Sequence, residues 1–291
     1  MKDTSDTADT ISTEQLKQLL QDAKEIAREA GKAILSIYQD GDYEQITKSD
    51  QTPVTSADYT SNEVLTAALG KLTPDIPIIS EEMKPIDFAE RKKWSRYWLL
   101  DPLDGTQEFI SRSGFFAVNI ALVENGWPML GVIYWPCEDV TYYAAKGLGC
   151  YKKIHQDDQS ITSRIRVAKQ SDPTRIRVAI SRVQKLSTVT RYLHDNIEPT
   201  YAKYGSCALK SCFVAEGLAD CYLRVGPTGE WDTGAPHVIV EEAGGKILDS
   251  EFNPLSYNQR KSLKNPDFFV LGDQELPWQD ILKPFPTERK Y

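Results

Sequence analysis

One segment, RYWLLDPLDGT at residues 96–106, constrains the possible folds of this chain more than any other. Its apolar first part has the length and composition of a buried strand, and it ends abruptly in carboxylates. A second strand-like segment, IPIISEE, also ends in acids, and another acid follows Trp231. Catalytic groups in open α/β sheets gather beyond the carboxyl ends of strands, so we expect these acids to converge. The residues concerned are Glu81, Glu82, Asp101, Asp104 and Asp232.

Convergence of these carboxylates requires protonation or bound cations. At a separation of ~5 Å, each pair repels by roughly 3 kcal/mol at an effective dielectric constant of about 20. All-oxygen ligands favour Mg²⁺, Mn²⁺ or Ca²⁺ over zinc, and Mg²⁺ typically links one or two carboxylates to phosphate oxygens. The alternative is that each acid is only a solvated strand cap.

The turn itself suits a phosphorylated ligand. Pro102 stiffens it, and Gly105 lets the backbone approach a ligand closely. If Thr106 opens a helix, the free N–H groups of residues 105–107 can bind an anion. The alternative is a polar turn between a strand and a helix.

The overall composition excludes several classes of partner. Forty-two acids against 34 bases give a net charge of −8, which argues against binding to nucleic acid or an acidic membrane. No run of 18 apolar residues is present, and the polar N-terminus resembles no secretory signal. Five cysteines without CxxC spacing favour a reducing cytoplasm over disulfides or zinc. No Walker or dinucleotide-binding motif and no hydrolytic triad is evident.

We expect the chain to divide into a disordered tail at 1–12, an α+β half at 13–160 and an α/β half at 161–291. Ser12 with Gln15 predicts a capping box that starts a helix ending at Gly41. A second helix is expected over about 58–69. Asn125 and Gly126 predict a hairpin in a meander of strands, and the polar stretch 156–163 reads as the loop between the halves. The second half alternates strands and helices, including a helix near 183–195.

Three motifs resemble the inositol monophosphatase superfamily of magnesium-dependent, lithium-sensitive phosphatases. They are SEE at 80–82, DPLDGTQEF at 101–109 and WDTGAPHVIVEEAGG at 231–245. The resemblance spans about residues 15–275 and implies a layered αβαβα sandwich of the inositol monophosphatase and fructose-1,6-bisphosphatase type. KSDQTPVTSAD, Glu108 in DGT-x-E-F and VAEGLADCYLR resemble its 3′(2′),5′-bisphosphate nucleotidase branch. Inositol monophosphatases carry asparagine in place of this glutamate.

The resemblance also implies roles for individual residues. The first metal would be held by Glu81, Asp101, Asp104 and the Leu103 carbonyl, and the second by Asp101, Asp104 and Asp232. Gly105 and Thr106 would bind the scissile phosphate. Thr106, oriented by Asp50 or Glu81, would take a proton from the attacking water. The substrate wall would consist of Ser206, Lys210 and Arg224.

The expected reaction is hydrolysis of the 3′-phosphate of adenosine 3′,5′-bisphosphate, with two or three Mg²⁺ ions and Mn²⁺ as an alternative. This would serve sulfate assimilation, and the sulfated 3′-phosphonucleotide could be a further substrate. The enzyme would be a cytoplasmic monomer or homodimer, either free or peripheral on the inner membrane face.

Two alternatives remain, an inositol or sugar phosphatase and a non-catalytic metal-binding scaffold. Two departures from the branch bear on adenine recognition: Val183-Gln184 follows Ser181-Arg182, and Pro236-His237 replaces small residues.

Overall fold

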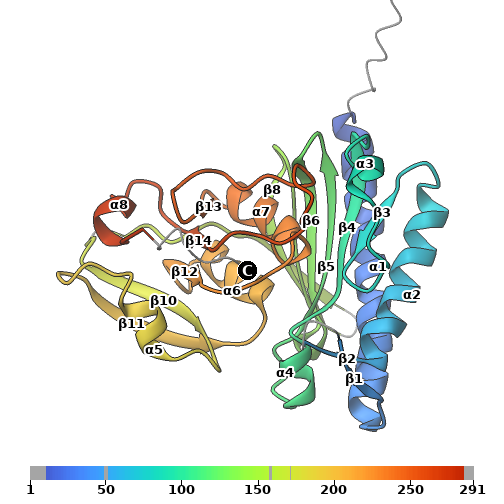
Figure 1. The fold of residues 1–291 in the computed structure, drawn as a ribbon, viewed down its shortest axis with the longest axis horizontal. Helices are drawn as coiled ribbons and strands as arrows, with labels where there is room; N and C mark the ends of the chain where they lie inside the picture. The colour runs from blue at the N-terminus through green and yellow to red at the C-terminus, as the bar shows by residue number, and fades with distance from the viewer. Residues whose placement is uncertain (1–10, 49–51, 157–158, 171, 285–291) are drawn as a thin grey trace, which may run out of the picture.

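The computed structural model describes residues 11–48, 52–156, 159–170 and 172–284. Figure 1 shows these residues stacked as helices, sheet, helices, sheet, helices. This is the αβαβα sandwich predicted from the sequence. Within the described ranges, no helix is long and apolar enough to span a membrane. The tail predicted at 1–12 lies outside the described residues except for its last two.

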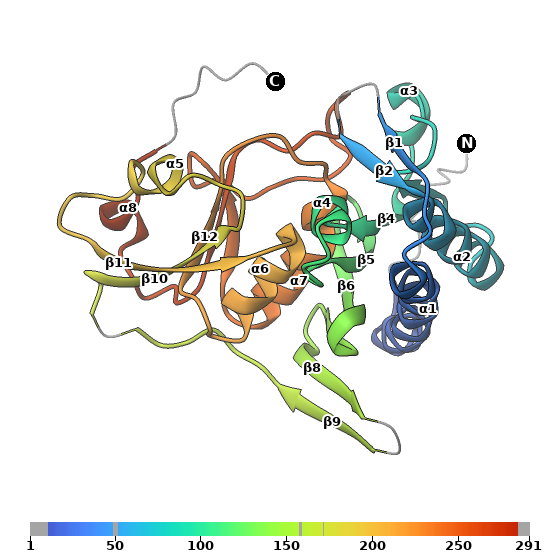
Figure 2. The same cartoon turned by 90° about the horizontal axis from the view of Figure 1, so that it is seen from below.

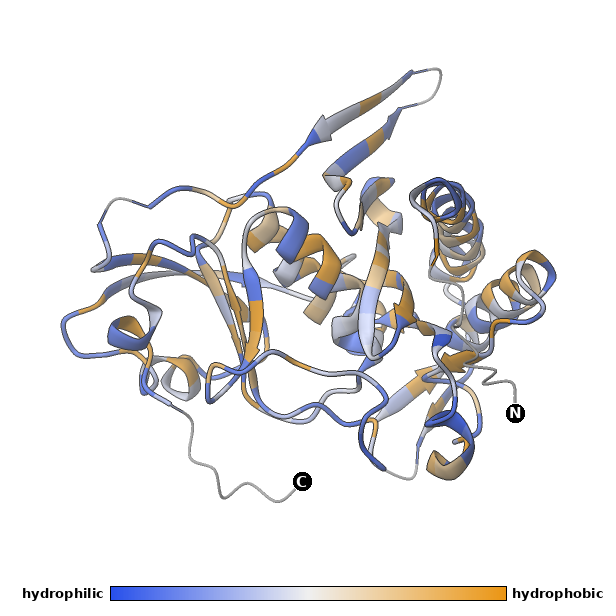
Figure 3. Ribbon diagram, turned by 90° about the horizontal axis from the view of Figure 1, so that it is seen from above, coloured by the Kyte–Doolittle hydropathy of each residue, from blue (hydrophilic) through white to orange (hydrophobic). Residues whose placement is uncertain are grey.

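The first helical layer consists of α1 (Thr13–Asp40) and α2 (Ser56–Leu72). Ser12 Oγ accepts from the Gln15 amide at 3.2 Å and the Gln15 side chain accepts from the Ser12 amide at 2.9 Å, so the predicted capping box is confirmed. Gly41 ends the helix with a φ of 73°. In Figure 3 the outward side of α1 is hydrophilic, because its apolar side packs against the first sheet.

The first sheet has seven strands in the described part of the chain, in the order β3-β4-β5-β6-β7-β8-β9. Asn125 and Gly126 both have positive φ and form the predicted hairpin turn between β5 and β6. A small separate pair, β1 and β2, precedes α2. The bounds of these strands are β1 (Gln45–Thr47), β2 (Pro53–Thr55), β3 (Ile78–Ser80), β4 (Arg96–Asp104), β5 (Ala117–Glu124), β6 (Trp127–Trp135), β7 (Val140–Ala145), β8 (Gly149–Gln156) and β9 (Gln159–Arg164).

The loop expected over 156–163 is instead part of a hairpin. The antiparallel strands β8 and β9 pair from Gln156 opposite Gln159 to Tyr151 opposite Arg164. The side chains of β9 are exposed throughout. The segment therefore lacks the apolar alternation from which a strand can be predicted. The first sheet extends past residue 160, where the sequence placed the boundary between the halves.

The middle layer consists of α6 (Cys207–Ala215) and α7 (Trp231–Glu242), packed between the two sheets. The second sheet has five strands in the order β11-β10-β12-β14-β13 within the described residues. Their bounds are β10 (Arg175–Ser181), β11 (Glu198–Tyr204), β12 (Cys221–Arg224), β13 (Lys246–Asp249) and β14 (Phe268–Leu271).

The outer layer covers the second sheet with α5 (Leu186–Thr190) and α8 (Trp278–Ile281). The helix expected over 183–195 is reduced to α5, and Val183 lies before it, 84% exposed. Two short helices, α3 (Phe88–Arg91) and α4 (Thr106–Ile110), and a 3₁₀ turn at Pro136–Glu138 complete the described elements. Figure 2 shows α4 beside α6 and the end of β11.

Candidate metal and phosphate site

Three aspartates from two layers meet where β4 ends. Asp101 and Asp104 belong to β4, and Asp232 lies in the first turn of α7. One carboxylate oxygen from each lies within 4.8 Å of the others. Asp101 and Asp104 are buried. The convergence expected from the strand ends is therefore present for these three acids.

A β-bulge in β4 shapes this end of the strand. Asp101 lies opposite Asn119 and Asp104 opposite Ala117, so β4 has one residue more than β5 in this interval. Such an insertion bends a strand and re-aims its side chains. The Leu103 amide donates to Asp101 Oδ1 at 3.1 Å, which fixes that carboxylate. The Leu103 carbonyl, a predicted metal ligand, lies 3.4 Å from the Thr106 hydroxyl.

Asp104 is held by the beginning of α6. The amides of Cys207 and Ala208 donate to its two oxygens at 3.2 and 2.7 Å, and the Ser206 hydroxyl also donates to it. Helix N-termini stabilise such anions. Ser206, predicted to contact substrate, is thus engaged with Asp104.

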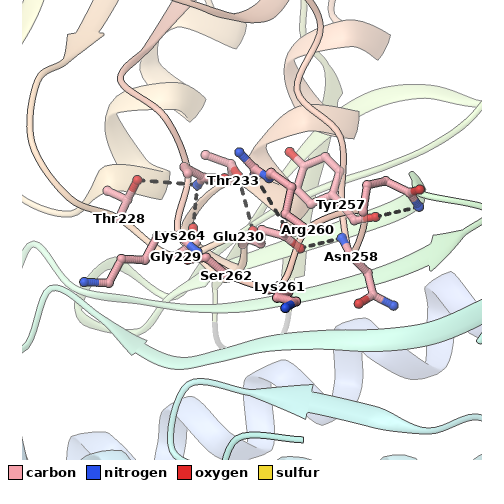
Figure 4. A network of polar contacts seen from close by, with 12 residues as sticks. Thr228, Gly229, Glu230, Thr233, Tyr257, Asn258, Arg260, Lys261, Ser262 and Lys264 are labelled. Atoms are coloured by element: carbon pink, nitrogen blue, oxygen red, sulfur yellow. Dashed lines mark hydrogen bonds and ion pairs between the residues drawn. The ribbon is translucent and has the colours of Figure 1, made fainter. Parts of the chain in front are cut away.

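A network of polar contacts surrounds Gly229 and Glu230, in the turn before Asp232 (Figure 4). The Gly229 amide donates to Asp232 Oδ2 at 2.6 Å, and Asn265 Nδ2 donates to the Gly229 carbonyl at 2.6 Å. The buried Glu230 accepts from the Asn258 amide at 2.7 Å. The segment 258–265 therefore supports the turn whose Gly229 amide binds Asp232.

The same network joins the two halves of the chain. Asn258 Nδ2 donates to the Arg91 carbonyl at 2.7 Å, and the Arg91 guanidinium donates to Asn258 and, at 2.9 Å, to the Arg260 carbonyl. Arg91 ends α3, shortly after the segment that carries Glu81. Acids from both halves are thus held in a common framework.

The electrostatics of the cluster fit a divalent cation. Burial, and then the charges of Glu81, Asp104 and Asp232, raise the pKa of Asp101 well above its usual range. Burial, Asp104 and Glu81 raise the pKa of Asp232 to about 8. Carboxylates that disfavour ionisation beside one another are stabilised by a hard cation with oxygen ligands. These residues can therefore hold a metal.

Glu81 lies at the border of this cluster. Its pKa is raised by burial and further by Asp58 and Asp104, although the ammonium of Lys48 opposes the shift. Lys48 Nζ lies 3.0 Å from Glu81 and 2.7 Å from Glu82. Glu81 and Glu82 therefore share the positive charge of Lys48.

Thr106 has a partner that the sequence did not reveal. Its hydroxyl donates to Asp58 Oδ1 at 3.0 Å, while Oδ2 of the same carboxylate caps α2 by accepting from Thr55. Burial raises the pKa of Asp58. Asp50, predicted for this role, lies outside the described residues. The sequence does contain a signal for Asp58, because this residue ends the motif at 48–58. An acid at this position is also expected in a capping box at the start of a helix, so its presence does not by itself indicate a catalytic role.

The predicted basic wall flanks the cluster. Lys210 is 3% exposed on α6 and donates to the carbonyls of Gly205 and Ser206. Burial lowers its pKa to about 8. Arg224, at the end of β12, donates to the Pro227 carbonyl at 2.9 Å. Both residues lie close enough to Asp104 for its negative charge to raise their pKa values.

An ion pair also joins the halves, beside α4. Arg182 Nε lies 3.4 Å from Oε2 of the buried Glu108, which also accepts from the Ser113 hydroxyl. A Cβ on Gly205 would lie 2.6 Å from the Glu108 side chain, so only glycine fits here. Arg182 was not among the predicted site residues, because nothing near it in sequence indicates Glu108.

Comparison with known proteins gives a consistent result. Residues 15–272 match the sequence model of the inositol monophosphatase family. The chain is 43% identical over 263 residues to the 3′(2′),5′-bisphosphate nucleotidase CysQ of Aggregatibacter actinomycetemcomitans, covering 90% of this chain and 96% of that protein. It is 42% identical to CysQ of Escherichia coli K12, covering 87% and 99% of the two chains.

Solved structures agree with this family match. The crystal structure of CysQ from Bacteroides thetaiotaomicron superposes with a TM-score of 0.74 at 36% identity, over 88% of this chain and 98% of that one. The Thermotoga maritima inositol monophosphatase TM1415 superposes with a TM-score of 0.70 at 24% identity, over 87% and 92% of the two chains, which supports the fold.

Proposed function

Because the chain belongs to the inositol monophosphatase family, we propose that it is a 3′(2′),5′-bisphosphate nucleotidase. It hydrolyses the 3′-phosphate of adenosine 3′,5′-bisphosphate to AMP and phosphate, in sulfate assimilation, and accepts the sulfated 3′-phosphonucleotide as a further substrate. The observation that carries this proposal is the triad Asp101, Asp104 and Asp232 beside the Thr106–Asp58 pair. Relatives that carry this activity in their names cover most of the chain.

Mg²⁺ is the cofactor in this proposal, with Mn²⁺ as a substitute, and two or three ions are bound per site. Asp101, Asp104, Asp232, Glu81 and the Leu103 carbonyl would hold them. Bound there, the metal supplies a Lewis acid for the phosphoryl oxygens and lowers the pKa of a water molecule.

Thr106 and Asp58 handle the proton of the attacking water. The Thr106 hydrogen is directed to Asp58, so its oxygen is left to accept a hydrogen bond from the water. As the water oxygen bonds to phosphorus, the bond to the 3′-oxygen breaks. The water proton moves toward this pair, and the leaving 3′-oxygen takes a proton from solvent to become the 3′-hydroxyl of AMP. Gly105, with a φ of 100°, gives the phosphate access to the backbone.

Lys210 and Arg224 provide positive charge for the second phosphate of the nucleotide. An inositol monophosphate has no such phosphate, so these two residues distinguish the substrates. We place the enzyme in the cytoplasm, because all five cysteines are free thiols.

The test compares phosphate release from adenosine 3′,5′-bisphosphate and inositol 1-phosphate at equal concentration, with Mg²⁺, with and without lithium. We expect a strong preference for the nucleotide, which Lys210→Met combined with Arg224→Met abolishes. A preference for inositol 1-phosphate would overturn the substrate, and no release from either would favour a scaffold.

A further inference from the structure

Asn119, in the middle of β5, carries a buried side chain without a hydrogen-bond partner. The residue is 1% exposed. Neither Nδ2 nor Oδ1 is bonded to any part of the protein that the structure describes. A carboxamide has two donor hydrogens and an acceptor oxygen, and leaving all of them unpaired in the interior is costly. A partner outside the protein is therefore expected.

The position of Asn119 indicates where that partner lies. Asn119 pairs directly with Asp101 in the antiparallel ladder of β4 and β5, two neighbouring strands in Figure 1. Opposed residues point to the same face of a sheet, with Cβ atoms about 4.5–5.5 Å apart. Ala117 and Ala121, two positions to either side, pack in the core that contains α6 and α7. The carboxamide thus faces the layer that carries Asp232.

We propose that Asn119 is a positioning residue of the metal site, whose carboxamide binds a water molecule in the coordination shell of the metal held by Asp101. The proposal rests on the metal site that the proposed function requires. Mg²⁺ and Mn²⁺ keep waters when bound by few carboxylates, and such waters are strong donors toward an amide oxygen. The Nδ2 group then donates to a neighbouring oxygen of the same shell.

The test is calorimetric titration of the metal-free protein with Mn²⁺, together with its melting temperature before and after Mn²⁺ is added. Asn119→Leu removes the unpaired amide at similar volume. Tyr97→Phe is the matched control, because Tyr97 Oη is also buried and unpartnered, on the same strand face four residues before Asp101.

We expect Asn119→Leu to weaken Mn²⁺ binding 10–100-fold, the usual effect of losing an outer-shell partner, without lowering the metal-free melting temperature. Tyr97→Phe should leave Mn²⁺ affinity unchanged. Unchanged affinity in Asn119→Leu would overturn the proposal, as would a lower metal-free melting temperature with normal affinity.

Two further outcomes keep the test decisive. Where leucine is not accommodated, Asn119→Ala removes the amide without adding volume, and normal Mn²⁺ affinity in that variant overturns the proposal. If the wild-type protein itself fails to bind Mn²⁺, the proposed function fails, which this titration distinguishes from a failure of Asn119 alone.

Discussion

The carboxylate of Asp58 serves two structures at once: Oδ1 accepts the Thr106 hydroxyl at 3.0 Å, and Oδ2 accepts the Thr55 amide at 2.8 Å at the start of α2. The first contact orients a candidate catalytic hydroxyl, and the second caps the N-terminus of α2. The position of α2 is therefore coupled to the orientation of Thr106.

Asp58→Asn should reduce turnover at least ~10²-fold, because general-base assistance contributes on that scale. The matched control is Thr55→Ala, which removes the hydroxyl that donates to Asp58 Oδ2 but leaves Asp58 Oδ1 and its bond to Thr106 in place. It should cost about 1 kcal/mol of stability and keep most of the turnover. Steady-state kinetics and urea unfolding of both variants check this, and equal turnover in the two would contradict the role of Asp58.

Asp104→Asn should also cost at least ~10²-fold in turnover, the scale of one preorganised electrostatic group. The amides of Cys207 and Ala208 both donate to this side chain, and an asparagine can accept through only one of its two atoms. Phosphate release at saturating Mg²⁺ measures the loss. Full Mg²⁺-dependent activity would show that Asp104 is not a ligand.

Metal binding should release protons near neutral pH. Burial and the neighbouring carboxylates raise the pKa of Asp232 to about 8, so this carboxyl carries a proton at pH 7 before metal binds, and the same causes raise the pKa of Asp101. Binding requires the ionised forms, so affinity should rise with pH through this region. Calorimetry in two buffers of different ionisation enthalpy measures the released protons. Binding heats that do not depend on the buffer would refute this.

Lys210 should make stability depend on pH in the alkaline range. Its pKa is about 8 in the fold and about 10.4 when unfolded, so the unfolded chain binds more protons between these values. The free energy of unfolding of the wild type should therefore rise relative to Lys210→Met as pH increases from 8 to 10, by roughly 3 kcal/mol at most. Urea unfolding of metal-free protein tests it, with Lys17→Met, an exposed lysine, as the control. Parallel pH curves for wild type and Lys210→Met would rule it out.

The features that could be predicted from the sequence are those that depend only on residues close together in the chain. The capping box at Ser12 and the turn at Asn125 and Gly126 depend on residues a few positions apart, and both are present. The three aspartates were predictable because each stands at the end or start of an apolar element.

Other features required the structure. The hydrogen bond from Thr106 to Asp58 joins residues 48 positions apart. The Arg182–Glu108 pair joins the end of β10 in the second sheet to α4, which follows β4 of the first sheet. No local pattern encodes such contacts. The strand β9 was missed because its exposed polar side chains carry no buried face.

The hydrogen bonds from the start of α6 to Asp104 determine when the site can form during protein synthesis. A ribosome releases Asp101 and Asp104 long before it has synthesised either α6 or Asp232. The emerging first half therefore carries acids without the amide donors that fix one of them and without their third member. The three aspartates come together only after α6 and α7 have packed between the sheets, so an incomplete chain carries no finished acidic cluster.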